Sequence, residues 1–203
     1  MPNSNLDRRL AEERLRAMGF ELDGALNALH LVIHHSQAKD GKTYDWPAIR
    51  TYHMSYRKDG NIITQAQYEE YVRRQISSGL EKPWSDIGYH AGVELVDGQY
   101  RWNIGRSLKK IGAHANGFNQ QSFGVCFIGN YDQAAPPMAL WDFAAPTILD
   151  LMRWFVIPIK EVIGHREVYE RLGQVQAKTC PGSKWSMQEF RADLNRRLLE
   201  AVS

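Results

Sequence analysis

The sequence predicts an α/β protein in which helices flank one central mixed β-sheet. Segments with strand-like and helix-like composition alternate along most of the chain, an order typical of a sheet covered by helices. An Asp97-Gly98 pair between two strand-like runs adds an antiparallel hairpin. With 203 residues the chain is long enough to bury a core of its own, and one domain is the simplest arrangement.

The first third of the chain is predicted to hold one buried strand among three helices. Residues 5–18 are good helix formers followed by a glycine, and they predict a helix that packs on the main body as an accessory element. The run 29–35 (LHLVIHH) is apolar in its centre and predicts a buried strand. A short helix is expected to begin near Trp46-Pro47, because proline is favoured in a first helical turn, and another helix covers 64–79.

The rest of the chain is predicted to complete the sheet and its helical cover. Residues 122–130 (SFGVCFIGN) form an apolar run that predicts a central strand, and Pro136-Pro137 predict a loop. The other predicted elements are, in order, strands over 87–96 and 99–105, a helix from about 146 to 155, a strand over 160–165 and an amphipathic helix over 189–202.

Composition and charge weigh against several classes of function. The formal net charge is +2, and no dense block of Lys and Arg occurs, so nucleic-acid binding is not indicated. Residues 1–20 lack the apolar core of a secretory signal, and no apolar run has the length of a membrane span. We therefore expect synthesis in the cytoplasm without a signal peptide.

The two cysteines lie in different settings. Cys126 is inside an apolar run, where a free thiol behaves as a small buried hydrophobe. Cys180 lies in a polar loop between Lys178 and Pro181. A disulfide between them is the weaker interpretation. Cys180 is either a small residue filling a turn or a metal ligand with histidine partners elsewhere in the chain.

Histidines at strand ends are the candidate partners of Cys180. His34 and His35 end one predicted strand, and His165 ends another. Ends of neighbouring strands open onto the same crevice, and two imidazoles with one thiolate make a zinc set that leaves a fourth position for water. Their wide separation in the sequence favours an open catalytic site over a zinc finger. Most isolated histidines are surface or core residues, so spacing alone leaves both interpretations open.

Six short motifs then follow one another along the chain. They are VIHHS (32–36), WSDIGYH (84–90), GAHANGFN (112–119), SFGVCFIGN (122–130), GHREV (164–168) and AKTCPG (177–182). In this combination and order they resemble the zinc N-acetylmuramoyl-L-alanine amidases, the family of phage lysozyme-amidases and animal peptidoglycan-recognition proteins. The resemblance covers roughly residues 29–185.

The resemblance implies a set of metal ligands and catalytic residues. The zinc ligands of the family fall on His34, His165 and Cys180. Strand alternation lets only one of two adjacent histidines face the site, and the resemblance selects the first of the pair. Tyr89 matches the catalytic tyrosine of the family, and Lys178 matches the position of a catalytic lysine in its phage members. A phenol and an ammonium suit stabilisation of the oxyanion that forms during amide hydrolysis.

Two further residues are expected at the substrate groove. His114 and Asn119 lie in a glycine-bounded loop that borders this groove in the family, and either could hydrogen-bond the muramyl sugar or the stem peptide. A loop stabilised by its own polar side chains is an equally good interpretation. Glu167, two residues after His165, could orient a ligand or assist proton transfer, and a surface glutamate is the favoured interpretation.

As a whole, the resemblance implies a zinc-dependent peptidoglycan hydrolase with a peptidoglycan-recognition-protein-like fold. We expect a helical extension over 1–28 and a monomeric catalytic domain over 29–203 with a helical insert at about 40–83. The implied reaction is cleavage of the amide between N-acetylmuramic acid and L-alanine of the stem peptide. A phage endolysin that reaches the wall after membrane breach fits the missing signal. A non-catalytic muropeptide-recognition module and a regulatory protein with a structural zinc are the alternatives.

Overall fold

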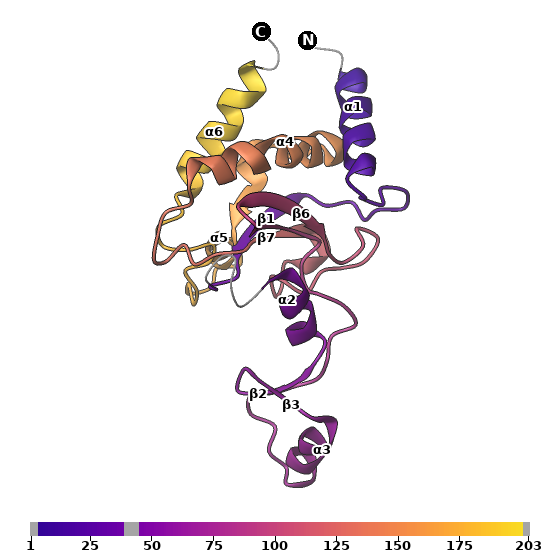
Figure 1. The fold of residues 1–203 in the computed structure, drawn as a ribbon, viewed down its shortest axis with the longest axis vertical. Coiled ribbons are helices and arrows are strands. Elements are labelled where there is room, and N and C mark those ends of the chain that lie inside the picture. Colours follow the sequence, from indigo (N-terminus) through magenta and orange to yellow (C-terminus); the bar gives the residue numbers. More distant parts are fainter. Residues whose placement is uncertain (1–3, 39–44, 201–203) are drawn as a thin grey trace.

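A five-stranded mixed sheet forms the centre of the computed structural model, which describes residues 4–38 and 45–200 (Figure 1). The sheet has the order β6-β5-β7-β1-β8. Its strands are β1 (His30–His35), β5 (Ala91–Val96), β6 (Gln99–Ile104), β7 (Ser122–Phe127) and β8 (Val162–Gly164). The strand β1 runs parallel to β7 and β8, and β5 runs parallel to β7 and antiparallel to β6. The predicted mixed sheet is therefore confirmed.

Helices lie on both sides of this sheet. The helices are α1 (Ser4–Ala17), α2 (Trp46–His53), α3 (Gln65–Arg73), α4 (Met138–Phe155), α5 (His165–Arg171) and α6 (Met187–Glu200), with 3-10 turns η1 (Asn119–Gln121) and η2 (Ile159–Glu161). Figure 1 shows α1, α4 and α6 together on one side of the sheet and α2 on the other. No helix in the described part of the chain is both long and apolar enough to cross a membrane.

Strand alternation on β1 separates the core from the site. Leu31 and Ile33 are fully buried in the main hydrophobic cluster, which also holds Ile148 of α4. Val32 points the other way, into a smaller cluster that contains Val168 of α5. Since side chains two residues apart on a strand share a face, the even-numbered positions of β1 face away from α4.

The N-terminal helix is joined to the main core. Leu15 of α1 is fully buried in the same hydrophobic cluster as the centre of α4. Arg14 donates two hydrogen bonds to the Asp150 carboxylate of α4, at 2.7 and 2.6 Å. Charge-assisted bonds of this paired kind fix orientation as well as adding stability. The expected accessory helix is therefore packed as a layer on α4.

The helix α4 corrects a sequence expectation. It begins at Met138, whereas the sequence predicted a start near residue 146. Pro146 lies inside the helix, although proline lacks an N–H and its ring crowds the preceding turn. Leu140 and Ala144, on the N-terminal side of this proline, are buried against the core. Their burial keeps the helix continuous through the proline.

Three other boundaries differ from the predictions. The strand β5 begins at Ala91, four residues later than expected, and α3 ends at Arg73, ahead of a left-handed Gln75. The strand predicted over 160–165 ends at Gly164, and His165 is the first residue of α5. Gly164 has the extended backbone of an N-cap, so the chain turns into a helix at the residue that was expected to end a strand.

The insert expected to be helical is mixed. Between α2 and β5 the chain forms a second sheet of order β3-β2-β4, made of β2 (Tyr56–Lys58), β3 (Asn61–Ile63) and β4 (Leu80–Glu81), together with α3. We call residues 54–83 the arm, because Figure 1 shows them extending away from the five-stranded sheet. Residues 39–44 of the predicted insert lie outside the described residues. The three strands are too short to leave a clear alternating pattern in the sequence.

Candidate metal centre

Three side chains that are distant in sequence converge at one point. His34, His165 and Cys180 each offer a ligand atom, and these atoms all lie within 4.8 Å of one another. All three residues are buried. No other group of three His, Cys, Asp or Glu side chains with such spacing occurs among residues 4–38 and 45–200. The structure thus brings together the three residues that the sequence analysis named as ligands.

The parallel pairing of two strands places the two histidines. Ile33 of β1 is in register with Gly164 of β8, so His34 and His165 each follow this matched pair in their own chain segment. Their rings lie 4.6 Å apart between centroids. The carboxyl ends of neighbouring parallel strands meet at one edge of a sheet, as the sequence analysis assumed.

Backbone hydrogen bonds hold the cysteine beside them. The N–H of Arg166 donates to the carbonyl oxygen of Cys180 at 2.7 Å, which ties the cysteine loop to the first turn of α5. The N–H of His35 points at the Cys180 sulfur at 3.4 Å. The thiol is therefore held between the end of β1 and the start of α5.

The spacing of the donor atoms fits a tetrahedral zinc ion. Zinc lies about 2.0–2.1 Å from a histidine nitrogen and about 2.3 Å from a cysteine sulfur, so two such donors at a tetrahedral angle are about 3.5 Å apart. Nδ1 of His34 lies 3.6 Å from Sγ of Cys180. Imidazole and thiolate are also the ligand types that zinc prefers.

The electrostatics of the cluster also suit a cation. Burial lowers the pKa of His34 well below its ordinary value and that of His165 to about 4, so both rings are neutral and keep a free lone pair. Burial raises the pKa of the Cys180 thiol to about 12. A bound divalent cation would offset the cost of a buried thiolate, because its charge favours the deprotonated ligand.

The second nitrogen of His34 has a partner in His114. Nε2 of His34 and Nδ1 of His114 are 3.0 Å apart, both within the buried interior. If Nδ1 of His34 binds a metal, its Nε2 carries the proton and donates to His114. His114 also lines the cavity described below, and its expected contact with substrate stays a prediction.

Asn119 stabilises the loop that carries His114. Its side-chain oxygen accepts hydrogen bonds from the N–H groups of His114 and Ala115, at 2.9 and 2.8 Å. Asn119 does not line the cavity. Of the two interpretations drawn from the sequence, the structure thus supports a loop stabilised by its own polar side chain. A contact of Asn119 with substrate stays a prediction without structural support.

His35 is turned away from the cluster, as strand alternation requires. Its Nδ1 accepts a hydrogen bond from the N–H of Tyr131 at 3.2 Å, and its ring stacks on that of Tyr131. Burial lowers the pKa of His35 to about 4. The imidazole of His34 is therefore the one of this pair whose ring joins the cluster.

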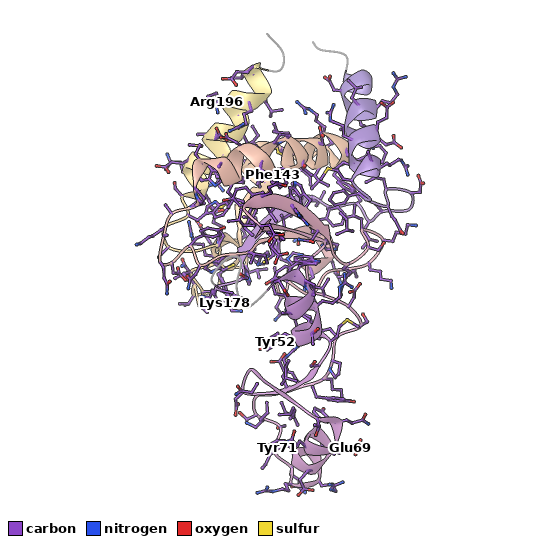
Figure 2. The ribbon with its side chains drawn as sticks, viewed as in Figure 1. Tyr52, Glu69, Tyr71, Phe143, Lys178 and Arg196 are labelled. Atoms are coloured by element: carbon purple, nitrogen blue, oxygen red, sulfur yellow. The ribbon has the colours of Figure 1, made fainter. Side chains whose placement is uncertain are left out.

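An open cavity of about 830 Å³ lies over the cluster. This volume is in the range of pockets that hold small ligands. The cavity lining includes the three candidate ligands and the loop 177–179, together with Gly60 of the arm and Tyr52 and Trp84, which lie next to the arm in sequence. Figure 2 shows Lys178 and Tyr52 on the side of the sheet away from α4.

Both predicted catalytic side chains line this cavity. The ring of Tyr89 lies 5.1 Å from that of His34, and burial raises the pKa of its phenol well above the ordinary value. The phenol is therefore a protonated hydrogen-bond donor. Lys178 is on the exposed loop, and its charge contributes to the lowered pKa values of His34 and His165.

Glu167 departs from its interpretation as a surface residue. Its carboxylate accepts a hydrogen bond from the N–H of Gly164 at 2.7 Å and two from Arg191, at 2.9 and 3.0 Å. It therefore caps the helix that begins with His165 and joins that helix to α6. The capping pattern of a glutamate three residues after a helix N-cap was the sequence signal for this role.

The fold and the cluster together define a class of protein. It is the class of α/β proteins with a candidate His-His-Cys metal centre at the carboxyl ends of parallel strands, open to a ligand-sized cavity. The family model of N-acetylmuramoyl-L-alanine amidases (Amidase_2) matches residues 25–183. The chain belongs to this family.

Curated relatives of the chain include recognition proteins and lytic enzymes. Peptidoglycan-recognition protein LB of Drosophila melanogaster is 33% identical over 106 residues, which cover 52% of this chain and 41% of that protein. The endolysin of Klebsiella phage KP32 is 30% identical over 97 residues, 48% of this chain and 60% of the endolysin. The Mus musculus N-acetylmuramoyl-L-alanine amidase is 32% identical over 108 residues, 50% of this chain and 18% of the mouse protein. The matched region thus spans at most about three fifths of these relatives.

Solved structures show the same fold. The amidase LysC from Clostridium intestinale URNW superposes with a TM-score of 0.54 at 22% identity, covering 84% of this chain and 87% of LysC. The Apis mellifera recognition protein PGRP-SA gives a TM-score of 0.51 at 22% identity, covering 80% and 81% of the two chains. The predicted likeness to the recognition-protein and amidase fold is confirmed.

Proposed function

We propose that this chain is a zinc-dependent N-acetylmuramoyl-L-alanine amidase that acts on peptidoglycan. The observation that supports it is the convergence of His34, His165 and Cys180 within 4.8 Å beneath an open cavity, in a chain of the amidase family. The bond cleaved is the amide between the lactyl group of N-acetylmuramic acid and L-alanine. Water adds its hydroxyl to the lactyl carbonyl carbon and its proton to the alanine nitrogen as the C–N bond breaks.

The ligand roles follow from the donor atoms. Nδ1 of His34, one ring nitrogen of His165 and Sγ of Cys180 hold the zinc ion in this proposal. When bound, zinc supplies a Lewis acid for the carbonyl and an activated water for hydrolysis. Nδ1 of His114 accepts a hydrogen bond from the protonated Nε2 of His34 and so fixes the orientation of that ligand.

Two side chains are proposed to act on the substrate oxygen. The phenol of Tyr89 stays protonated in its buried position, so it can donate a hydrogen bond to the amide oxygen as negative charge develops there. Lys178 lies on the exposed loop at the edge of the same cavity, where its ammonium adds positive charge. Both groups would stabilise the transition state more than the bound substrate.

The substrate is proposed to lie between the cluster and the base of the arm. This cavity carries aromatic side chains on the arm side, namely Tyr52 and Trp84. Aromatic faces can pack against the apolar faces of a sugar ring. We place the muramyl-peptide in this space, with the amide at the cluster.

The curated relatives leave two functions for comparison, an amidase and a recognition module. Some are named for peptidoglycan recognition and others as endolysin or amidase. Cys180 favours the amidase, because the family resemblance implies that the cysteine ligand marks its catalytic members. The likeness to a phage endolysin supports a role as a phage or prophage endolysin that meets the cell wall after membrane breach.

The test uses zinc-loaded protein and purified peptidoglycan sacculi. Release of stem peptides with a new L-alanine amino terminus is expected from wild type, and loss of this release from Cys180→Ser and His165→Ala. Zinc content is measured on the same samples. Tight binding of muropeptides by zinc-loaded wild type without release would favour the recognition module instead.

A further inference from the structure

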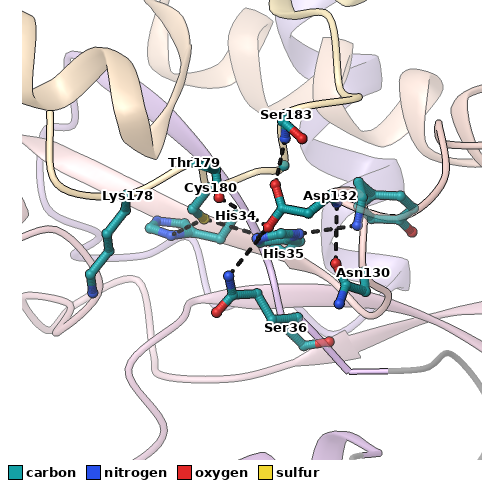
Figure 3. A network of polar contacts seen from close by, with 12 residues as sticks. His34, His35, Ser36, Asn130, Asp132, Lys178, Thr179, Cys180 and Ser183 are labelled. Carbon is teal, nitrogen blue, oxygen red and sulfur yellow. Dashed lines mark hydrogen bonds and ion pairs between the residues drawn. The ribbon is translucent and has the colours of Figure 1, made fainter.

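A single carboxylate holds both sides of the cysteine ligand. Asp132, on the loop after β7, accepts a hydrogen bond from the N–H of Ser183 at 2.7 Å and from the hydroxyl of Thr179 at 3.0 Å. These partners lie one residue before and three residues after Cys180. Figure 3 shows Asp132 between the Cys180 loop and His35.

The same carboxylate reaches the end of β1. Gln37 donates to Oδ2 of Asp132 at 3.4 Å, and Nε2 of His35 faces this oxygen at 3.9 Å. The backbone of Asp132 is itself fixed, because its N–H donates to the side-chain oxygen of Asn130 at 3.1 Å. One acidic side chain thus links the chain after β1, the loop after β7 and the cysteine loop.

The cysteine needs such support more than the two histidines do. His34 lies in a central strand and His165 in a helix, so regular backbone hydrogen bonds fix both. Cys180 follows an irregular stretch, residues 174–179, that is exposed throughout. Ordering a loop residue costs conformational entropy, which a few polar contacts must offset.

Backbone and arginine contacts hold the same loop from two sides. Arg166 holds the Cys180 carbonyl from the α5 side, and its guanidinium donates to the carbonyl oxygens of Thr179 and Gly182. On the opposite side, the N–H of Lys184 donates to the carbonyl of Tyr131 at 2.9 Å. The Asp132 carboxylate, by contrast, accepts hydrogen bonds from residues on both sides of the cysteine, Thr179 and Ser183.

We propose that Asp132 is a positioning residue for the cysteine ligand, holding the loop 179–183 so that the Cys180 sulfur lies at the metal position. The inference rests on the proposed zinc centre. Outer groups that orient metal ligands are typically worth about 10–100-fold in metal affinity. Asp132 acts through hydrogen bonds and touches neither metal nor substrate.

The test compares two substitutions at this position. Asp132→Ala removes both acceptors, and zinc affinity, measured by competition with a chelator, is expected to fall by about 10–100-fold. Asp132→Asn keeps an oxygen that accepts from the Ser183 N–H, and its amide N–H can donate to the Thr179 hydroxyl, but it no longer accepts from Gln37. Its zinc affinity is therefore expected to fall less than that of Asp132→Ala. Thr179→Val removes one of the two loop contacts and should fall between these variants.

A second readout reports on the sulfur alone. Cobalt(II) bound to a thiolate gives a sulfur-to-metal charge-transfer absorption, which should weaken in Asp132→Ala and persist in Asp132→Asn. Asp142→Ala is the matched control, since Asp142 is an exposed carboxylate on α4 that pairs with Arg197, away from the cluster. Thermal unfolding of each variant shows whether the fold is retained.

The outcomes separate this inference from the proposed function. If wild type binds neither zinc nor cobalt, the metal centre itself is refuted. If wild type binds both and folded Asp132→Ala keeps the affinity and the sulfur absorption of wild type, the role of Asp132 is refuted. Equal losses in the Asn and Ala variants would also overturn it, because the two loop contacts that Asn can retain, with Ser183 and Thr179, would then not be what holds the cysteine.

Discussion

Nδ1 of His114 lies 3.0 Å from Nε2 of His34, whose other ring nitrogen lies 3.6 Å from the Cys180 sulfur. The two nitrogens of one imidazole are thus divided between the candidate metal position and a buried neighbour. This division fixes the tautomer of His34 once its Nδ1 is bound to a metal. His114 therefore has a role in orienting the His34 ring, which is separate from the contact with substrate that the sequence analysis expected of it.

Substitution of His114 by alanine is the first prediction. The variant leaves Nε2 of His34 without an acceptor in a buried place, so zinc affinity should fall by about 10–100-fold. His114→Gln, whose amide oxygen can accept the same hydrogen bond, should recover part of the loss. Chelator competition measures both. Wild-type affinity in the alanine variant would show that the contact is incidental.

The ion pair of Glu167 with Arg191 gives the second prediction. Glu167→Ala loses the cap on the Gly164 N–H and two charge-assisted bonds, so the free energy of unfolding should fall by about 2–3 kcal/mol. This free energy of unfolding is measured by urea denaturation of the metal-free protein. In a double-mutant cycle, Arg191→Ala should cost much less in the Glu167→Ala background than in wild type. Additive costs would contradict a coupled pair.

Much of the site could be predicted from strand ends and motifs. His34 lies at the end of a run of apolar residues, and two adjacent buried histidines on a strand must face opposite sides, which the structure shows for His34 and His35. The resemblance resolved which of the two faces the cluster. The hairpin at Asp97-Gly98 could also be predicted from adjacent residues alone. Both residues have the positive φ that such a turn needs.

Other features depend on contacts that no local pattern records. The start of α4 was missed because burial of Leu140 and Ala144 outweighs the local cost of Pro146. The strands of the arm are held by pairing with one another across intervening turns and helix. The contacts of Asp132 join three segments that are far apart in sequence, so nothing near Asp132 in the sequence indicates them.

Tyr89 provides the third prediction, on catalysis. Tyr89→Phe removes the phenol hydroxyl and keeps the ring that packs beside His34. If the hydroxyl stabilises the developing negative charge, kcat should fall by about 100-fold or more, with zinc affinity and KM little changed. Rates of stem-peptide release from sacculi and zinc titrations measure the two effects. A variant with wild-type kcat would remove Tyr89 from the catalytic machinery.

Arg57 leads to the fourth prediction, on the arm. Its side chain is almost fully buried, pairs with Glu81 at 2.7 Å, and lies over the rings of Tyr52 and Trp84 at 4.8 and 5.1 Å. Arg57→Ala should loosen the arm, because these contacts join its small sheet to the end of α2 and the cavity wall. Faster amide hydrogen exchange is expected in β2 and β4, and unchanged exchange in β1 and β7.

The same variant tests the substrate position. Since Tyr52 and Trp84 line the cavity, a loosened arm should raise KM more than it lowers kcat. Glu81→Gln is the milder control, which removes the charge of the partner and leaves the guanidinium in contact with both rings. Unchanged kinetics beside faster exchange in the arm would show that the arm does not contact substrate.

The fifth prediction concerns acid sensitivity and rests on His90. Nδ1 of His90 accepts a hydrogen bond from the N–H of Gly124 at 3.0 Å, and Nε2 lies 3.0 Å from the Lys110 carbonyl, to which it donates. The first bond requires the neutral ring, because a protonated Nδ1 cannot accept a hydrogen bond. Burial lowers the pKa of His90 to about 4, against 6.5 for an unperturbed histidine.

The sign of the effect follows from these two pKa values. Above pH 6.5 the ring is neutral in both the folded and the unfolded chain, so His90 adds no pH dependence. Between pH 6.5 and about 4, the unfolded chain takes up a proton that the folded chain does not, and stability falls as the pH falls. Over this window the loss from His90 is about 3 kcal/mol, since each pKa unit corresponds to about 1.4 kcal/mol.

His90→Asn separates this proton from the hydrogen bonds. The amide oxygen can replace Nδ1 as the acceptor for the Gly124 N–H, and the side chain does not titrate in this window.

Urea unfolding of metal-free protein is measured from pH 7.5 to 4.5. The difference at pH 7.5 reports the altered contacts, and the slope below pH 6.5 reports the proton. Because His35 and His53 also have pKa values lowered to about 4, the variant should keep a shallower slope. If the free energy of unfolding fell equally steeply with falling pH in wild type and variant, a neutral buried His90 would be contradicted.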